Sequence, residues 1–147
     1  MKKIRHGTNR GQGVLLVLYA LRELGGVRSK REVIDFIQAA DFYEVTAHDL
    51  PPYDGQNEPK YHTLLAWARK DALENGWLVD TTKKDEWLLS REGREIIDQN
   101  IPRYQTGRFN VRDCYLWTAK FKKLIDPSYE ASPSDKKRPQ EYPIDYI

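Results

Sequence analysis

The segment Trp77–Gly93, WLVDTTKKDEWLLSREG, constrains the fold more than any other part of this sequence. Its two apolar runs, 77–80 and 86–89, are short enough to be strands, and the polar residues 81–85 form a loop of hairpin length between them. Ser90 is then placed to cap a following helix. The sequence therefore predicts a β-hairpin that holds out a loop of threonines and lysines and leads directly into a helix.

Helical patterns dominate the rest of the chain. Apolar residues recur at helical spacing over 11–24, and two glycines end that helix. A second helix begins after Ser29, which is placed to form a capping box with Glu32. A third helix runs over about 59–75, with a proline in its first turn and a glycine past its end. The helix after the hairpin is expected over 90–100.

The order helix, helix, helix, hairpin predicts a mainly α fold with a small β-hairpin, a winged helix-turn-helix, over residues 1–103. Residues 104–126 add an amphipathic helix, predicted over 111–125. Its aromatic side chains have to be buried, either against the winged helix or in a homodimer or protein-partner contact through residues 110–126. Residues 127–147 are rich in Pro, Ser, Asp, Lys and Tyr and are expected to be a flexible tail or to lie along another surface.

Composition excludes several classes of protein. At 147 residues the chain suits one domain of ordinary size, and its longest apolar run, 14–21, is far short of the roughly 18–20 residues that span a bilayer. No small-residue cleavage site follows that run, so a cytoplasmic protein without membrane contact is expected. The single Cys114 excludes disulfides within the chain, and His6, His48 and His62 are too scattered for a metal site. No P-loop string occurs, so neither metal nor cofactor is predicted.

Charge is segregated along the chain, although the net charge is only +2. Residues 1–31 carry eight Lys or Arg and one Glu, whereas residues 32–59 carry seven Asp or Glu and no Lys or Arg. A basic head can bind a polyanion through one face even in a nearly neutral chain. The acidic stretch would repel DNA if it lay on that same face.

The third helix is the predicted recognition helix, because its apolar residues gather on one side at helical spacing. The opposite side carries mostly short polar side chains, as entry into a major groove about 12 Å wide requires. His62 and Thr63 lie in the first turn, where base contacts are usual, while the longer basic side chains suit phosphates. The predicted DNA-binding residues are Lys60, His62, Thr63, Arg69 and Lys70 of this helix, Thr81, Thr82, Lys83 and Lys84 of the hairpin loop, and Arg10 near the N-terminus.

Two strings in this region form a recognisable pattern. The first is Trp67-Ala68-Arg69 followed by Leu73 and Gly76, and the second is Trp87-x-Leu89-Ser90-x-x-Gly93. Over residues 12–100 the sequence resembles the N-terminal winged-helix domain of Mrr-type restriction proteins. In that family a WAR-x-x-x-L string followed by a glycine precedes one strand and W-x-L-T-x-x-G ends the next. The resemblance implies a DNA-binding module in a family tied to the restriction of modified DNA.

Mrr-type proteins continue into a PD-(D/E)xK nuclease domain, which this sequence does not supply. The closest string combines Asp54 with Glu58 and Lys60. That class needs two carboxylates and a lysine on neighbouring strands to hold a metal ion and assist the attacking water. Three residues between Asp54 and Glu58 cannot form two strands, so no catalytic residues are predicted and the protein is not expected to be an enzyme.

Two hypotheses follow. The first is a non-catalytic protein that binds double-stranded DNA, as a regulator or as the DNA-targeting module of a restriction or defence system. The second is a winged helix used for protein–protein interaction or dimerisation without DNA binding. Four tryptophans also raise the idea of a pocket for a modified base, although core packing explains them adequately.

Overall fold

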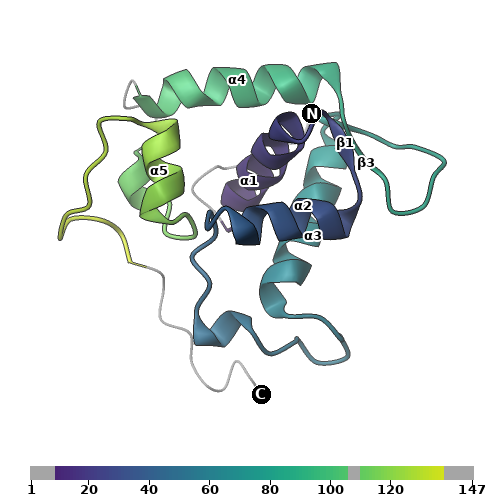
Figure 1. The fold of residues 1–147 in the computed structure, drawn as a ribbon, viewed down its shortest axis with the longest axis horizontal. Helices are drawn as coiled ribbons and strands as arrows, with labels where there is room; N and C mark the ends of the chain where they lie inside the picture. The colour runs from purple at the N-terminus through teal and green to yellow at the C-terminus, as the bar shows by residue number, and fades with distance from the viewer. Residues whose placement is uncertain (1–8, 106–109, 138–147) are drawn as a thin grey trace.

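The computed structural model describes residues 9–105 and 110–137, which form a mainly helical domain with a small antiparallel sheet (Figure 1). The α-helices are α1 (Asn9–Glu23), α2 (Lys30–Ala39), α3 (Lys60–Glu74), α4 (Arg91–Gln105) and α5 (Ala119–Ile125). The strands are β1 (Val27–Arg28), β2 (Leu78–Val79) and β3 (Trp87–Leu89), and two short 3₁₀ turns are η1 (Ala47–Asp49) and η2 (Val111–Asp113). No helix in this part of the chain combines the length and apolar character that a membrane crossing requires.

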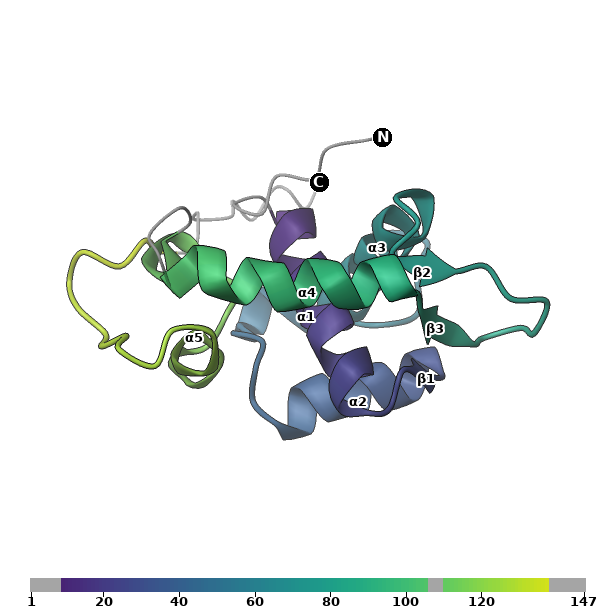
Figure 2. The same ribbon diagram turned by 90° about the horizontal axis from the view of Figure 1, so that it is seen from above.

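Helix α1 is the centre of the core. Val14, Leu15, Leu16 and Val17 are all buried, although they point in different directions around the helix. A helix that is apolar all round has to be surrounded by protein. Figure 2 shows α1 crossing beneath α4, with α2 and α3 on its other sides.

The predicted hairpin is confirmed, and a third strand joins it. β2 pairs with β3 in the register Leu78 to Leu89, and β1 pairs with the other edge of β3. Two residues are too few to show a strand period, so β1 gave no sequence signal. It forms because Gly25 and Gly26 adopt φ values of 97° and 102°, which turn the chain back toward the hairpin.

Ser90 and Gly93 join the hairpin to α4. The Ser90 hydroxyl donates to the carbonyl of Gly76 at 2.6 Å and accepts from the amide of Gly93 at 2.9 Å. The predicted cap is therefore confirmed, and the same hydroxyl also ties the end of α3 to the start of α4. Helix α4 continues to Gln105, so the predicted boundary between residues 103 and 104 falls inside a continuous helix.

The prediction of one helix over 111–125 is wrong. The chain forms η2, leaves helical geometry, and begins α5 after Thr118, whose hydroxyl accepts from the amide of Phe121. The reason is a buried glutamine in α1. The amide of Leu116 donates to Gln12 Oε1 at 2.8 Å, and Trp117 Nε1 donates to the Gln12 carbonyl at 3.2 Å. A continuous helix would satisfy the Leu116 amide within itself and leave Gln12 without this partner.

The aromatic side chains of residues 111–125 pack inside this chain. The Phe121 ring lies 5.1 Å from that of Tyr19, 4.9 Å from that of Phe42 and 4.9 Å from that of Trp117, centroid to centroid. Residues 9–105 and 110–126 thus share one core. The predicted homodimer or partner contact through residues 110–126 was inferred from these aromatic side chains, and the chain itself buries Trp117 and Phe121.

Residues 127–137 pack along η2 and α5, so this part of the predicted flexible tail is ordered. The Arg112 guanidinium donates to Asp135 at 2.7 Å and to the Ser132 hydroxyl at 2.9 Å. The Tyr129 hydroxyl also donates to Asp135. Burial and this hydrogen bond raise the pKa of Tyr129 to about 12. The remaining residues of the predicted tail, 138–147, lie outside the described residues.

Candidate nucleic-acid interface

The candidate interface consists of the outer side of α3 and the hairpin loop Thr81–Asp85, here called the wing loop. In Figures 1 and 2 this loop projects beyond the sheet, at the end of the molecule opposite α5. The loop is anchored at its base. Asp85 has a φ of 59°, and its carboxylate accepts from the amide of Lys30 at the start of α2, at 3.1 Å.

The tip of the wing loop presents polar side chains to solvent. The Thr81 hydroxyl accepts from the amide of Lys83 at 3.3 Å, which closes a local turn. Thr82, Lys83 and Lys84 are exposed, and the only ion pair that these three form with a described residue is a long one, 3.9 Å from Lys83 to Glu86. Two lysine side chains are therefore available to an external anion.

Helix α3 exposes less of its outer side than the sequence predicts. Lys70 and Glu74 are exposed and His62 and Arg69 are half-buried, but Thr63 is buried. The prediction that Thr63 contacts a base is therefore wrong.

The acidic segment, residues 40–59, packs on part of the outer side of α3. The Tyr53 ring stacks on Trp67 at 5.4 Å, one helical turn after Thr63, so this segment lies against the same side of α3. Trp67 remains 42% exposed and is the exception to the expected core packing of the tryptophans, since Trp77, Trp87 and Trp117 are buried.

Replacing Thr63 with valine is expected to raise the free energy of unfolding by about 1 kcal/mol. No described residue hydrogen-bonds the buried Thr63 hydroxyl, whereas valine has nearly the same shape and no polar group. Chemical denaturation checks this, with Thr82→Val in the wing loop as the exposed control. A loss of stability in Thr63→Val would mean that the hydroxyl has a partner in solution.

Arg69 connects α3 with the sheet. Its guanidinium carbon lies 6.0 Å from the centre of the Trp87 ring on β3, and its buried Nε has no hydrogen-bond partner among the described residues. No described carboxylate lies within ion-pair distance of Arg69. Its charge is therefore held between the exposed side of α3 and the hairpin without being neutralised there.

Arg10 and Lys60 serve the fold instead of an open surface. Arg10 binds the buried carboxylate of Asp71 through two nitrogens, at 2.6 and 2.7 Å. The Lys60 ammonium lies 3.5 Å from His48 Nε2 and 5.5 Å from the centre of the Tyr53 ring, within the acidic segment.

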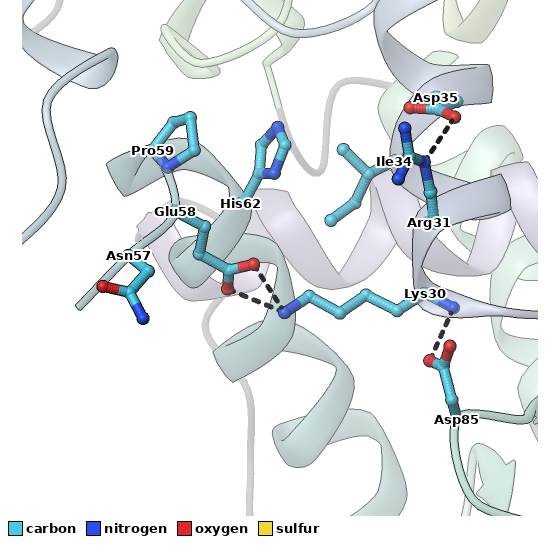
Figure 3. A pocket seen from close by; sticks show the side chains of 9 residues that line it. All are labelled: Lys30, Arg31, Ile34, Asp35, Asn57, Glu58, Pro59, His62 and Asp85. Carbon is cyan, nitrogen blue, oxygen red and sulfur yellow. Dashed lines mark hydrogen bonds and ion pairs between the residues drawn. The ribbon is translucent and has the colours of Figure 1, made fainter.

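His62 faces a cavity of about 390 Å³ between α2, the start of α3 and the wing loop (Figure 3). Lys30 crosses this cavity and pairs with Glu58 at 2.7 Å. Burial is the main cause that lowers the pKa of His62, so the neutral imidazole is favoured. His62 therefore lies at the edge of the exposed side of α3, where it is half-buried and faces the cavity.

The structure brings together two basic runs that are far apart in the sequence. Arg28 lines a hollow of about 490 Å³ with Lys83 and Lys84 of the wing loop, and Lys30 and Arg31 follow at the start of α2. The sequence shows the basic head but gives no reason to select these residues, because only the β1–β3 pairing brings them to the hairpin.

Carboxylates temper this basic surface. Arg28 pairs with Glu32 at 3.8 Å and Arg31 with Asp35 at 3.7 Å, and all four side chains are exposed. Exposed pairs of this kind are worth well under about 1 kcal/mol, so a phosphate can compete for the cations. Within the described ranges, no group of three or more His, Cys, Asp or Glu side chains is close enough to hold a metal ion.

Comparisons with family models, with curated proteins and with solved structures found no match to this chain. The resemblance to Mrr-type restriction proteins therefore stays a prediction from the quoted residues.

Proposed function

We propose that residues 9–105 form a winged helix-turn-helix domain that binds double-stranded DNA without catalysis. The observation that carries this proposal is the contact of Arg69 with Trp87, which holds the exposed side of α3 next to the hairpin. A winged helix uses these two elements together, one in the major groove and the other along the backbone.

The available cations suit phosphate contacts more than base recognition. Lys70 and Arg69 would meet the backbone along α3, and Lys83 and Lys84 would meet it from the wing loop. Arg28 beside the loop adds to the same surface. The side chains on the outer side of α3 offer few base-edge donors after Thr63 is removed from the set, which favours binding with modest sequence preference.

The acidic segment is compatible with this proposal because several of its carboxylates are used within the fold. Asp49 is buried and accepts from the amide and the hydroxyl of Thr46, and Glu58 pairs with Lys30. The segment does depart from a compact helix-turn-helix, in which three or four residues join the two helices. Here residues 40–59 separate α2 from α3.

The biological role that we propose rests on the resemblance to Mrr-type proteins. It is that of a regulator, or of the DNA-targeting module of a restriction or defence system acting in the cytoplasm. We do not include recognition of a modified base in this role, because three of the four tryptophans are buried and the exposed Trp67 is stacked on Tyr53.

Fluorescence anisotropy with labelled random duplexes, methylated and unmethylated, tests DNA binding. If four phosphates are engaged, Kd is expected to rise about 100-fold between roughly 50 and 200 mM salt. The variant Lys70→Ala, Lys83→Ala, Lys84→Ala should reduce the slope of log Kd against log salt by about three. Lys123→Ala on α5, at the far end of the molecule, is the matched control and should bind like the wild type.

A triple variant with wild-type affinity and salt slope would reject this surface as the DNA site. An absence of binding even at low salt would reject DNA binding altogether. It would favour the second function, protein interaction, for which the stacked and exposed Tyr53 and Trp67 offer an apolar surface. That kind of contact should barely respond to salt.

A further inference from the structure

Another cavity, of about 280 Å³, lies between Glu44, the segment 115–122 that includes the start of α5, and residues 129–137. In Figure 1, α5 lies at the end of the molecule opposite the wing loop. The cavity contributes nothing to the surface proposed to bind DNA. Aromatic rings and lysines line it together, so it offers a ligand both apolar surface and positive charge.

Lys122 is the central residue of this cavity. The side chain is buried, with only 6% of the residue exposed, and no described carboxylate lies within ion-pair distance of its ammonium. Its nearest identified interaction is with the ring of Tyr129, whose centre is 5.4 Å from Nζ. Lys122 lines the cavity although the residue as a whole is buried, as a long lysine stem allows.

A buried ammonium without a counter-ion is costly, and a cation–π contact offsets only part of that cost. Asp135, the closest acidic candidate, already accepts from Arg112 and Tyr129. These two donors hold the pKa of Asp135 below its ordinary value, the Tyr129 hydroxyl being the larger cause. The Lys122 charge also acts on Asp135, as a smaller cause, but no ion pair joins the two, so the carboxylate neutralises Lys122 only in part.

Two further lysines border the same cavity. Lys136 places its ammonium 5.3 Å from the centre of the Tyr115 ring, and Lys137 follows it. Against these three cations stand Glu44 and Asp135. Once the Arg112 partner of Asp135 is counted, the lining carries an excess of about two positive charges, which a dianion would balance.

We propose that this cavity binds a small phosphate-containing dianion, either inorganic phosphate or a small phosphomonoester, with Lys122 as the central ligand. Lysine is a common phosphate ligand because its ammonium is a compact point charge. Lys136 and Lys137 are exposed and can close over the bound group. The Tyr115 and Tyr129 rings would border the organic part of a monoester.

Thermal unfolding and calorimetric titration of the full chain test this site, with inorganic phosphate and phenyl phosphate as the probes and sodium chloride at matched ionic strength as the reference. Both probes should raise Tm above the chloride reference, because a ligand that binds only the folded state stabilises it. Tighter binding of phenyl phosphate would assign a phosphomonoester, and equal binding would assign free phosphate.

Lys122→Met keeps the buried stem and removes the charge, and it is expected to weaken binding at least tenfold. Lys123→Met, at the exposed neighbouring position, is the matched control and should bind as the wild type does. The proposal is overturned if the wild type responds to phosphate no more than to chloride, or if both variants bind equally well. If Lys122→Met does not unfold cooperatively, Lys136→Met decides, with several-fold weakening expected and unchanged binding contradicting the site.

Discussion

Replacing Gly93 with alanine is expected to lower the free energy of unfolding by about 3 kcal/mol or more. A Cβ atom at this position would lie 2.0 Å from the carbonyl oxygen of Trp77 and 2.8 Å from its carbonyl carbon. Both atoms belong to the backbone next to β2, so no side chain can rotate away. The start of α4 would have to move off the sheet, and the Ser90 hydrogen bonds would be strained with it.

The direction of this effect is informative, because alanine is intrinsically favoured over glycine inside a helix by about 1 kcal/mol. Glu92→Ala, at the adjacent exposed position of α4, should change stability by less than about 0.5 kcal/mol. Chemical denaturation followed by circular dichroism measures both variants. Equal midpoints for Gly93→Ala and Glu92→Ala would show that α4 does not approach Trp77 this closely.

Replacing Arg10 with methionine is expected to cost about 2 kcal/mol of stability. The Asp71 side chain is only 5% exposed, and the change would leave its carboxylate without the guanidinium that binds it at 2.6 and 2.7 Å. Breaking a buried pair in this way costs about 3–5 kcal/mol, and we take a lower figure because the Arg10 side chain is 48% exposed. Water can therefore reach the vacated position.

Arg22→Met is the matched comparison, since Arg22 also pairs with an aspartate, Asp98, at 2.6 Å. The Asp98 side chain is 56% exposed, so this loss should be below about 1 kcal/mol. Adding Asp71→Asn to Arg10→Met should restore part of the stability, because it removes the uncompensated charge. If the two arginine variants lose equal stability, the burial of Asp71 contributes nothing to the strength of its pair.

The Arg10→Met variant also tests whether Arg10 stabilises the fold or contacts DNA. The sequence predicted a DNA contact for this residue, whereas in the structure its guanidinium is bound to Asp71. At a temperature where the variant is fully folded, its DNA affinity should fall by much less than that of the Lys70, Lys83, Lys84 variant. If Arg10→Met loses as much DNA affinity as the Lys70, Lys83, Lys84 variant, Arg10 does contact DNA.

Part of the candidate site followed from the sequence and part did not. The hairpin, its exposed lysines and the exposed Lys70 lie where the periodicity and turn residues placed them. The cluster of Arg28 with the wing loop did not follow, because it depends on a two-residue strand that pairs with β3 about 60 positions later. Thr63 was misplaced because helical spacing reports only the helix itself and not the segment that packs against it.

Features that depend on one or two turns of chain followed from the sequence alone. The Ser29 and Ser90 caps, the glycines that end α1 and α3, and the helix and strand periods all act between residues a few positions apart. Their physical causes are local hydrogen bonds and backbone sterics, which neighbouring residue types reveal directly.

Contacts between distant residues became known only from the fold. Arg10 meets Asp71 across 61 positions, and Gln12 meets Leu116 across 104. The second contact ends one predicted helix and makes residues 111–125 part of the core instead of a dimer arm. Such pairings depend on which surfaces the packed helices bring together. The sequence around Arg10 or Gln12 does not show which of the many residues of a suitable type elsewhere in the chain is its partner. Burial and charge pairing at long range therefore had to be read from the fold.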